Sequence, residues 1–216
     1  QAIEDVALMR GIPGMQVFSP ADNEDMIGML ETIWDSPQPA YLRVNTRPGV
    51  IAHQPFEIGK AERLQEGKDL WILVHGMLLE EVLKTKDLLE SQGLSVGIAN
   101  MRSLVPIDEA FLSEITASGV PIFVVEDHFK IGGLYSIIAE WLLDKQRTAQ
   151  VHSIALDQRW FKPGLLTEVL RYEGFTGPQM AVRILEQMNI AFNKEHVLAS
   201  LGNAAKETGS TLPFVE

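Results

Sequence analysis

The sequence predicts an α/β protein, with a three-layer, doubly wound, mostly parallel sheet preceded by part of a second α/β domain. The apolar run 120–125 ends in two acidic residues, and the pair Gly132-Gly133 then opens a helical pattern. From Leu134 the apolar residues recur at i, i+3, i+4, i+7 and i+8, the spacing of one helix face. A run that is apolar on both faces is typical of a parallel strand between two helix layers. Strand-like and helix-like segments alternate along the remaining chain, as this fold class requires.

The first fifty residues show part of a strand–helix series. Residues 3–10 have a helical pattern, and residues 15–18 and 40–44 have strand patterns. Asp22 is expected to cap the helix between the two strands, because an aspartate side chain accepts hydrogen bonds from the free N–H groups of a first turn. Two strands are too few to close a sheet. The expected apolar face of the capped helix is Met26, Met29, Leu30, Ile33 and Trp34.

A stretch with several prolines, residues 48–55, indicates a boundary before a second and complete series. We therefore expect a first partial domain at 1–50, a main domain at 51–195 and a C-terminal tail at 196–216, which is polar and expected to be frayed from residue 200. The expected strands of the main domain are 70–74, 94–99, 120–125 and 151–155, and its helices begin their apolar faces at Leu79, Phe111, Leu134 and Ala181.

Composition excludes several classes of function. The chain has 216 residues, of which 46% are hydrophobic, enough for a sizeable core. Its net charge of −11, without a basic run, argues against nucleic-acid binding. The absence of cysteine excludes disulfides and thiolate sites. No apolar run approaches the ~20 residues of a membrane helix, and the first residues lack a secretory pattern. We expect a cytoplasmic protein that contacts no membrane.

Five short segments carry a further signal. They are QAIEDVALMRGIP at 1–13, SPAD at 19–22, GKA with EGKD at 59–69, MRSLVPID at 101–108 and VEDH with GGLYSIIAE at 125–140. In this order they resemble the end of the pyrimidine-binding domain and the C-terminal domain of the transketolase family. The resemblance runs over roughly residues 1–190.

This resemblance implies a transferase of carbohydrate metabolism that depends on thiamine diphosphate and Mg²⁺. Such an enzyme moves a two-carbon ketol unit from a ketose phosphate to an aldose. The family's metal-binding Gly-Asp-Gly…Asn segment does not occur in this sequence, and the family's activating glutamate and its Gly-Pro-Thr-His histidine would precede Gln1. The cofactor would therefore be bound mainly by residues outside this chain. We expect no catalytic, cofactor-binding or metal-binding residue within the chain, and activity only with an N-terminal section or subunit, in a homodimer or heterotetramer.

Two arginines are candidates for binding the phosphate of a sugar substrate. Arg43 and Arg47 flank the end of the 40–44 strand, and a guanidinium offers planar, paired donors that suit phosphate. The family resemblance implies that an arginine just after this strand holds the phosphate. The chain has Arg-Val-Asn-Thr-Arg where relatives commonly have Arg-x-x-Arg, so the spacing is one residue longer. Arg47 is the preferred residue and Arg43 the alternative; otherwise both pair with some of the 29 carboxylates.

Other polar residues at strand ends have weaker functional interpretations. Glu126, Asp127 and His128 could form an acid–base cluster, but the resemblance implies a structural or dimer-contact role. The pair Gly132-Gly133 could bind phosphate on free N–H groups, but close packing of helix on strand is the favoured interpretation. The histidines expected to be satisfied or exposed, not metal ligands, are His53, His75 and His152.

Alternatives to a transketolase section stay open at this point. The segments 161–166 and 172–175 resemble the ending shared by transketolases and deoxyxylulose-phosphate synthases. A synthase of that kind, or the beta subunit of a 2-oxoacid dehydrogenase, is the alternative within the same fold. A non-catalytic domain that only dimerises is the alternative from another class.

Overall fold

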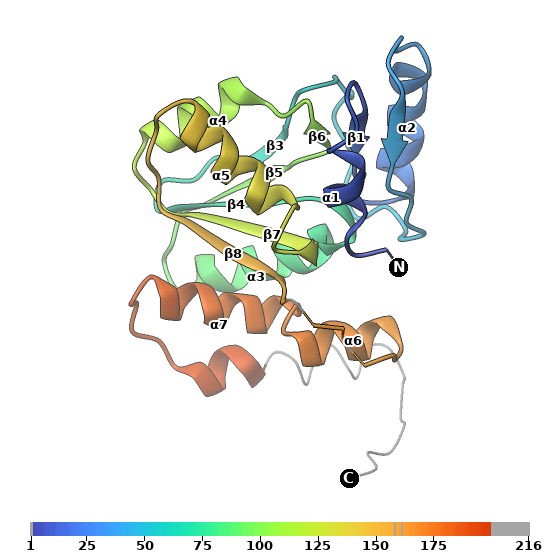
Figure 1. Ribbon diagram of the computed structural model, residues 1–216. Coiled ribbons are helices and arrows are strands. Elements are labelled where there is room, and N and C mark those ends of the chain that lie inside the picture. Colours follow the sequence, from blue (N-terminus) through green and yellow to red (C-terminus); the bar gives the residue numbers. More distant parts are fainter. Residues whose placement is uncertain (1, 158, 161, 200–216) are drawn as a thin grey trace.

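The computed structural model describes residues 2–157, 159–160 and 162–199, and within them the chain forms two sheets (Figure 1). The larger sheet has five strands in the order β3-β5-β4-β7-β8. Strands β5, β4, β7 and β8 are parallel to one another, and β3 is antiparallel to β5. These strands are β3 (Glu62–Gln65), β4 (Leu70–Val74), β5 (Val96–Asn100), β7 (Ile122–Phe129) and β8 (Val151–Leu156).

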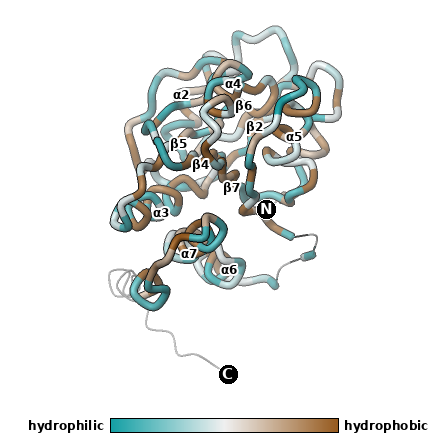
Figure 2. The backbone as a smooth tube through the Cα atoms, turned by 90° about the vertical axis from the view of Figure 1, so that its left-hand side faces the viewer, coloured by the Kyte–Doolittle hydropathy of each residue, from teal (hydrophilic) through white to brown (hydrophobic). Residues whose placement is uncertain are grey.

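The two central strands are buried on both faces, as their apolar runs predict. Every residue of β4 is buried, and β7 pairs with it from Trp71 opposite Ile122 onward. Successive side chains of a strand point to opposite faces, so Ile72 packs into the core on one side and Trp71 into the core on the other. Figure 2 shows the apolar stretches of β4 and β7 in the interior of the molecule.

Helices cover both faces of this sheet. On one face lie α3 (Leu79–Ser91), which follows the short helix η1 (Gly76–Leu78), and α7 (Gly177–Gln187). On the other face lie α4 (Glu109–Ala117) and α5 (Leu134–Asp144), whose buried residues include Leu134, Ile138 and Trp141. The predicted three-layer, mostly parallel α/β fold is confirmed.

Two strands of the structure were not predicted from the sequence. The edge strand β3 has the sequence ERLQ, with a single fully buried residue, so it lacks an apolar signal. It pairs through Glu62 opposite Asn100, which places two polar side chains together inside the molecule. The second strand, β6 (Ser103–Val105), has only three residues and ends directly before Pro106.

The smaller sheet combines strands from the first predicted domain with a strand from the second. It has the order β2-β1-β6, with β1 (Gln16–Phe18) parallel to β2 (Ala40–Leu42) and antiparallel to β6. The first fifty residues supply two of its strands, and β6 comes from beyond residue 100. The segments 1–50 and 51–195 therefore share a sheet, and the domain boundary at residue 50 stays a prediction.

The helix α2 (Asn23–Trp34) is capped as expected but is only partly covered. The Asp22 carboxylate accepts the backbone N–H groups of Glu24 and Asp25, each at 3.0 Å. Met29 of the predicted apolar face is buried, whereas Leu30 is 46% and Trp34 is 88% exposed. In Figure 1 this helix lies at the outer side of the smaller sheet, and α1 (Asp5–Met9) lies between that sheet and α5.

The last described part of the chain packs below the larger sheet. Helix α6 (Leu166–Glu173) precedes α7, and Val197 is buried in the same core as α3 and α7. From residue 200 on, the tail predicted at 196–216 lies outside the described residues. Within the described part of the chain, no helix has the length and apolar character needed to cross a membrane.

Candidate functional site

Arg43 is the more deeply held of the two candidate arginines. Its Nε lies 2.8 Å from Asp5 Oδ2 and its Nη1 lies 2.7 Å from Asp127 Oδ1, and its side chain is only 11% exposed. Nη2 donates to the carbonyl of Ala2 at 3.2 Å. Burial alone would lower the pKa of Arg43, but the two carboxylates raise it further above its ordinary value. An anion could reach Arg43 only by separating it from its two carboxylate partners.

Arg47 is more accessible and has one carboxylate partner among the described residues. Its side chain is 32% exposed and its Nη2 pairs with Glu80 at the start of α3. Lys84 pairs with the other oxygen of the same carboxylate at 3.0 Å. Burial would raise the pKa of Glu80, but Lys84 and Arg47 together hold it below its ordinary value. If Arg47 turned to an anion, Lys84 would still compensate Glu80.

The glycine pair before α5 serves packing, and the first two N–H groups of that helix are already bonded. Glu126 is fully buried and accepts the N–H groups of Leu134 at 2.7 Å and Tyr135 at 3.2 Å. A Cβ atom added to Gly133 would overlap this carboxylate, and one added to Gly132, whose φ is +85°, would overlap the side chain of Ala7. The end of the helix that could have bound a phosphate is thus filled by the protein's own carboxylate.

The other two members of the predicted acid–base trio also have structural partners. Burial would raise the pKa of Asp127, but Arg43 and His75 hold it below its ordinary value. His128 donates from Nδ1 to the carbonyl of Phe129 at 2.6 Å and accepts the N–H of Ala7 at 3.4 Å. Burial lowers its pKa. These contacts join β7 to the N-terminal segment.

His75, at the end of β4, is fully buried and linked to the smaller sheet. Its Nδ1 lies 2.9 Å from Ser19 Oγ, just after β1. Its Nε2 has no hydrogen-bond partner among the described residues and lies 3.6 Å from Glu126 Oε2. Doubly wound folds bind ligands where neighbouring parallel strands lead off in opposite directions, and here Ser19 bonds to His75 after β4 and Ala7 bonds to His128 near the end of β7.

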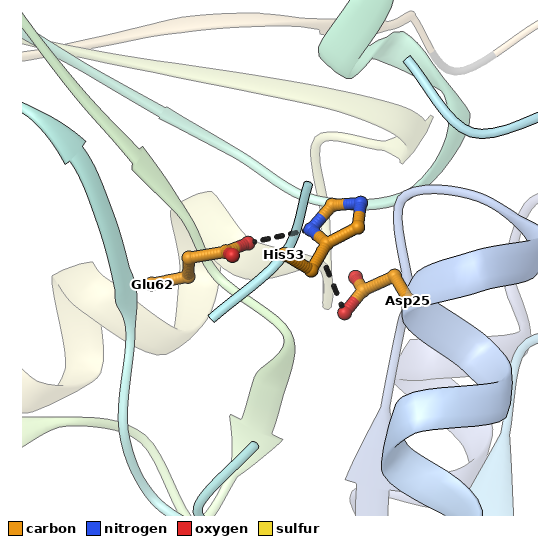
Figure 3. A group of neighbouring side chains, drawn as sticks. All are labelled: Asp25, His53 and Glu62. Atoms are coloured by element: carbon orange, nitrogen blue, oxygen red, sulfur yellow. Dashed lines mark hydrogen bonds and ion pairs between the residues drawn. The ribbon is translucent and has the colours of Figure 1, made fainter. Parts of the chain in front are cut away.

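A polar cluster under α2 was not foreseen from the sequence (Figure 3). His53 lies between two carboxylates, with Nδ1 2.9 Å from Glu62 Oε2 and Nε2 3.0 Å from Asp22 Oδ2. Asp25 Oδ1 lies 3.8 Å from Nδ1 and is paired with Arg102 at 3.1 Å. Burial by itself lowers the pKa of His53, but these carboxylates raise it to about 9. His53 is therefore protonated at neutral pH.

The two carboxylates that accept the hydrogen bonds of His53 have lowered pKa values in turn. Burial would raise the pKa of Asp22, but the bonds from Asp25 N–H and His53 lower it below its ordinary value. Burial likewise opposes ionisation of Glu62, but His53, Asn100 and the N–H of Gln54 lower its pKa.

Three of these residues could also be considered as metal ligands. One donor atom from each of Asp25, His53 and Glu62 lies within 4.8 Å of the others. A metal would have to displace the proton of His53 and tolerate the guanidinium of Arg102, which already occupy the carboxylate oxygens. The geometry favours a charge-compensated polar cluster that joins α2, the following loop and β3.

The resemblance seen in the sequence is supported by comparison with known proteins. The family model described as transketolase, C-terminal domain, matches residues 59–180. A Methanocaldococcus jannaschii protein named as a transketolase C-terminal section is 33% identical over 193 residues, 87% of this chain and 60% of the relative. A 1-deoxy-D-xylulose-5-phosphate synthase of Chlorobium phaeovibrioides is 30% identical over 186 residues, 83% of this chain and 29% of the synthase.

A solved structure agrees with the sequence comparisons. The structure titled "Split gene transketolase, inactive beta4 tetramer" superposes with a TM-score of 0.80 at 31% identity, over 88% of this chain and 63% of that chain. The chain thus spans less than two thirds of the length of each of these relatives. Family model, relatives and fold agree over the same central residues. The chain belongs to the transketolase family, a family of transferase-type enzymes, and carries its C-terminal domain.

Proposed function

We propose that this chain is the C-terminal section of a thiamine-diphosphate-dependent transketolase, active only together with an N-terminal section. The reaction would move a two-carbon ketol unit from a ketose phosphate to an aldose. The observation that carries the proposal is the likeness, at 31% identity, to a chain of a split-gene transketolase whose beta4 tetramer is titled inactive. The curated relative named as a C-terminal section supports the same division of the enzyme into two sections.

The cofactor would be held outside this chain. When bound, thiamine diphosphate supplies the ring carbon at which carbonyl groups are attacked, and a protein orients the reactants around it. The sequence has no Gly-Asp-Gly…Asn segment for a metal diphosphate. In the cluster of Asp25, His53 and Glu62 both carboxylates are buried and already compensated by Arg102, so the cluster does not fit that group. The described residues of this chain therefore do not fit the diphosphate end of the cofactor.

Within this section Arg47 would bind the substrate phosphate. It is the more exposed candidate, its one carboxylate partner has a second cation in Lys84, and its release leaves no buried charge without a counterion. Arg43 would instead hold Asp5 and Asp127 in place, because its two ion pairs are nearly buried. Removing one partner from such a buried pair costs far more than removing an exposed one.

A partner would cover the outer face of α2. Ile27, Leu30 and Trp34 lie three or four residues apart on this helix and are 65%, 46% and 88% exposed. An apolar stripe with an exposed tryptophan is typical of a surface that another chain or section buries. The strand β2 is also an edge strand of its sheet and could accept a further strand. We propose that the N-terminal section docks here, within a homodimer or heterotetramer.

A second candidate function is supported by the sequence relatives. The 1-deoxy-D-xylulose-5-phosphate synthase of Chlorobium phaeovibrioides is 30% identical over 186 residues. A synthase would use the same kind of cofactor but form a phosphorylated deoxyketose. The two candidates differ in their products, so the product formed by the reconstituted protein distinguishes them.

We expect the chain by itself to have no measurable affinity for thiamine diphosphate with Mg²⁺. The physical reason is that the chain lacks ligands for the diphosphate and its metal. Titration calorimetry with this chain, and then with the chain plus a section that carries the Gly-Asp-Gly…Asn segment, checks this. Magnesium-dependent binding at micromolar concentration to this chain alone would contradict the two-section proposal.

A further inference from the structure

The loop that carries Arg47 is held in place although it contains no helix or strand. This loop runs from residue 43 to residue 61, between β2 and β3. The carbonyl of Arg47 accepts the N–H of Asn23 at 3.0 Å, and its own N–H donates to Asn45 Oδ1 at 3.0 Å. The backbone of Arg47 is thus bonded to the first residue of α2.

His53 links the same loop to two carboxylates on different elements. Its ring donates to Asp22 before α2 at 3.0 Å and to Glu62 on β3 at 2.9 Å. These carboxylates also accept the N–H groups of Val50 at 3.3 Å and of Gln54 at 2.7 Å. A neutral imidazole has one N–H, so two bonds to ionised carboxylates require the protonated ring. The loop is therefore clamped by a charged histidine.

The surroundings of His53 make its charge necessary. The carboxylates that face it are Asp22 just before α2, Asp25 in α2 and Glu62 in β3, and these carboxylates also contact Asn100 at the end of β5 and Arg102 just after it. Three carboxylates thus face two cations, one of which is the histidine itself. Loss of its proton would leave three buried carboxylates with one guanidinium, and buried like charges repel strongly.

We propose that His53 is a positioning residue, which in its protonated form clamps the 43–54 part of the loop between α2 and β3 and so fixes Arg47 for a phosphorylated substrate. The role of Arg47 in this statement rests on the proposed function. The clamp itself rests on the contacts of His53 alone.

The clamp predicts a pH dependence of defined sign. The folded-state pKa of His53, about 9, lies above its ordinary value of 6.5. The contribution of the protonated ring is therefore complete below pH ~6.5 and is lost as the pH rises through about 9. The ring titration of the unmodified protein, followed by NMR of labelled histidine, should show one histidine with a midpoint near 9 that disappears in His53→Gln.

Hydrogen exchange tests the clamp without any substrate. In His53→Gln the protection factors of peptides from the 44–54 region should fall about 10- to 100-fold, the equivalent of one charge-assisted hydrogen bond. The central strand β4 should keep its protection. The matched control is His196→Gln, because His196 is an exposed histidine away from this cluster. In the unmodified protein, the same peptides should lose protection selectively above pH 9.

Two results would overturn the clamp: unchanged protection of the 44–54 peptides in a folded His53→Gln protein, or a His53 ring that titrates near 6.5. If His53→Gln fails to fold, hydrogen exchange of the unmodified protein at a series of pH values and its ring titration still test the clamp. Exchange of the control variant should match that of the unmodified protein.

Kinetics of the enzyme reconstituted with its N-terminal section separate the clamp from the proposed function. His53→Gln should raise the KM for a ketose phosphate roughly tenfold with little change in kcat, and leave an unphosphorylated ketose unaffected. If His53→Gln lowers the protection factors but Arg47→Ala leaves the KM for the ketose phosphate unchanged, the clamp is supported and the phosphate site is refuted. An effect of Arg47→Ala with no effect of His53→Gln on KM would refute the positioning role instead.

Discussion

Replacing Arg47 with alanine is expected to raise the KM for phosphorylated donors about 10- to 100-fold in the reconstituted enzyme. A charge-assisted contact between arginine and phosphate contributes about 1.5–3 kcal/mol, which corresponds to that range. The KM for the unphosphorylated ketose should hardly change, because the contact is made to the phosphate alone. Steady-state kinetics with matched phosphorylated and unphosphorylated donors measure the difference.

Arg43→Ala is the control for the one-residue uncertainty in spacing. Because Arg43 pairs with both Asp5 and Asp127, Arg43→Ala should lower the free energy of unfolding. It should not selectively raise the KM for phosphorylated donors. A well-folded Arg43→Ala enzyme that selectively loses phosphorylated donors would show that the shorter spacing is the correct one. If neither variant distinguishes the donors, the phosphate site lies elsewhere.

Arg102→Met is expected to lower the free energy of unfolding by about 3–5 kcal/mol. Arg102 is 3% exposed and donates to Asp25 Oδ1 at 3.1 Å and to the carbonyl of Gln54 at 2.9 Å. Without it, Asp25 and Glu62 stay buried with only His53 to compensate them. Methionine keeps most of the side-chain volume, so the decrease in the free energy of unfolding reflects the removal of the charge. Urea denaturation gives the free energy.

The matched control for Arg102→Met is Lys145→Met. Lys145 pairs with Glu109 at 2.9 Å on the surface, with side chains 39% and 57% exposed. Exposed pairs of this kind contribute about 0–1 kcal/mol. Equal losses for the two variants would contradict the view that the cluster under α2 is a buried, charge-compensated junction.

The architecture of the larger sheet could be predicted because its signals are local and strong. The run at 120–125 and the periodic face from Leu134 onward are read directly from neighbouring residues, and both are confirmed in β7 and α5. The strand β3 could not be predicted, because an edge strand with one buried residue needs no apolar pattern. The exposure of Trp34 could not be predicted either, since periodicity shows that a face is apolar but not that the chain covers it.

The candidate site was less accessible to sequence reasoning, because its partners are distant in the chain. Arg43 and Arg47 could be recognised as candidates, but their ranking depends on Asp127, 84 residues from Arg43, and on Glu80, 33 residues from Arg47. His53 was expected to be satisfied or exposed, but its partner could not be named, because Asp22 lies 31 residues away. One local signal existed: Glu62 follows His53 by nine residues across the loop.

Ketol transfer by the reconstituted protein would show whether this chain is one section of a two-section transketolase. This chain is assayed with a ketose phosphate donor, an aldose acceptor, thiamine diphosphate and Mg²⁺, first alone and then with an N-terminal transketolase section, supplied as a separate protein or fused upstream. We expect no transfer by the chain alone, and transfer that rises with added N-terminal section until the two are equimolar. Full activity of the chain alone, or no activity with a section that binds both the cofactor and this chain, would contradict it.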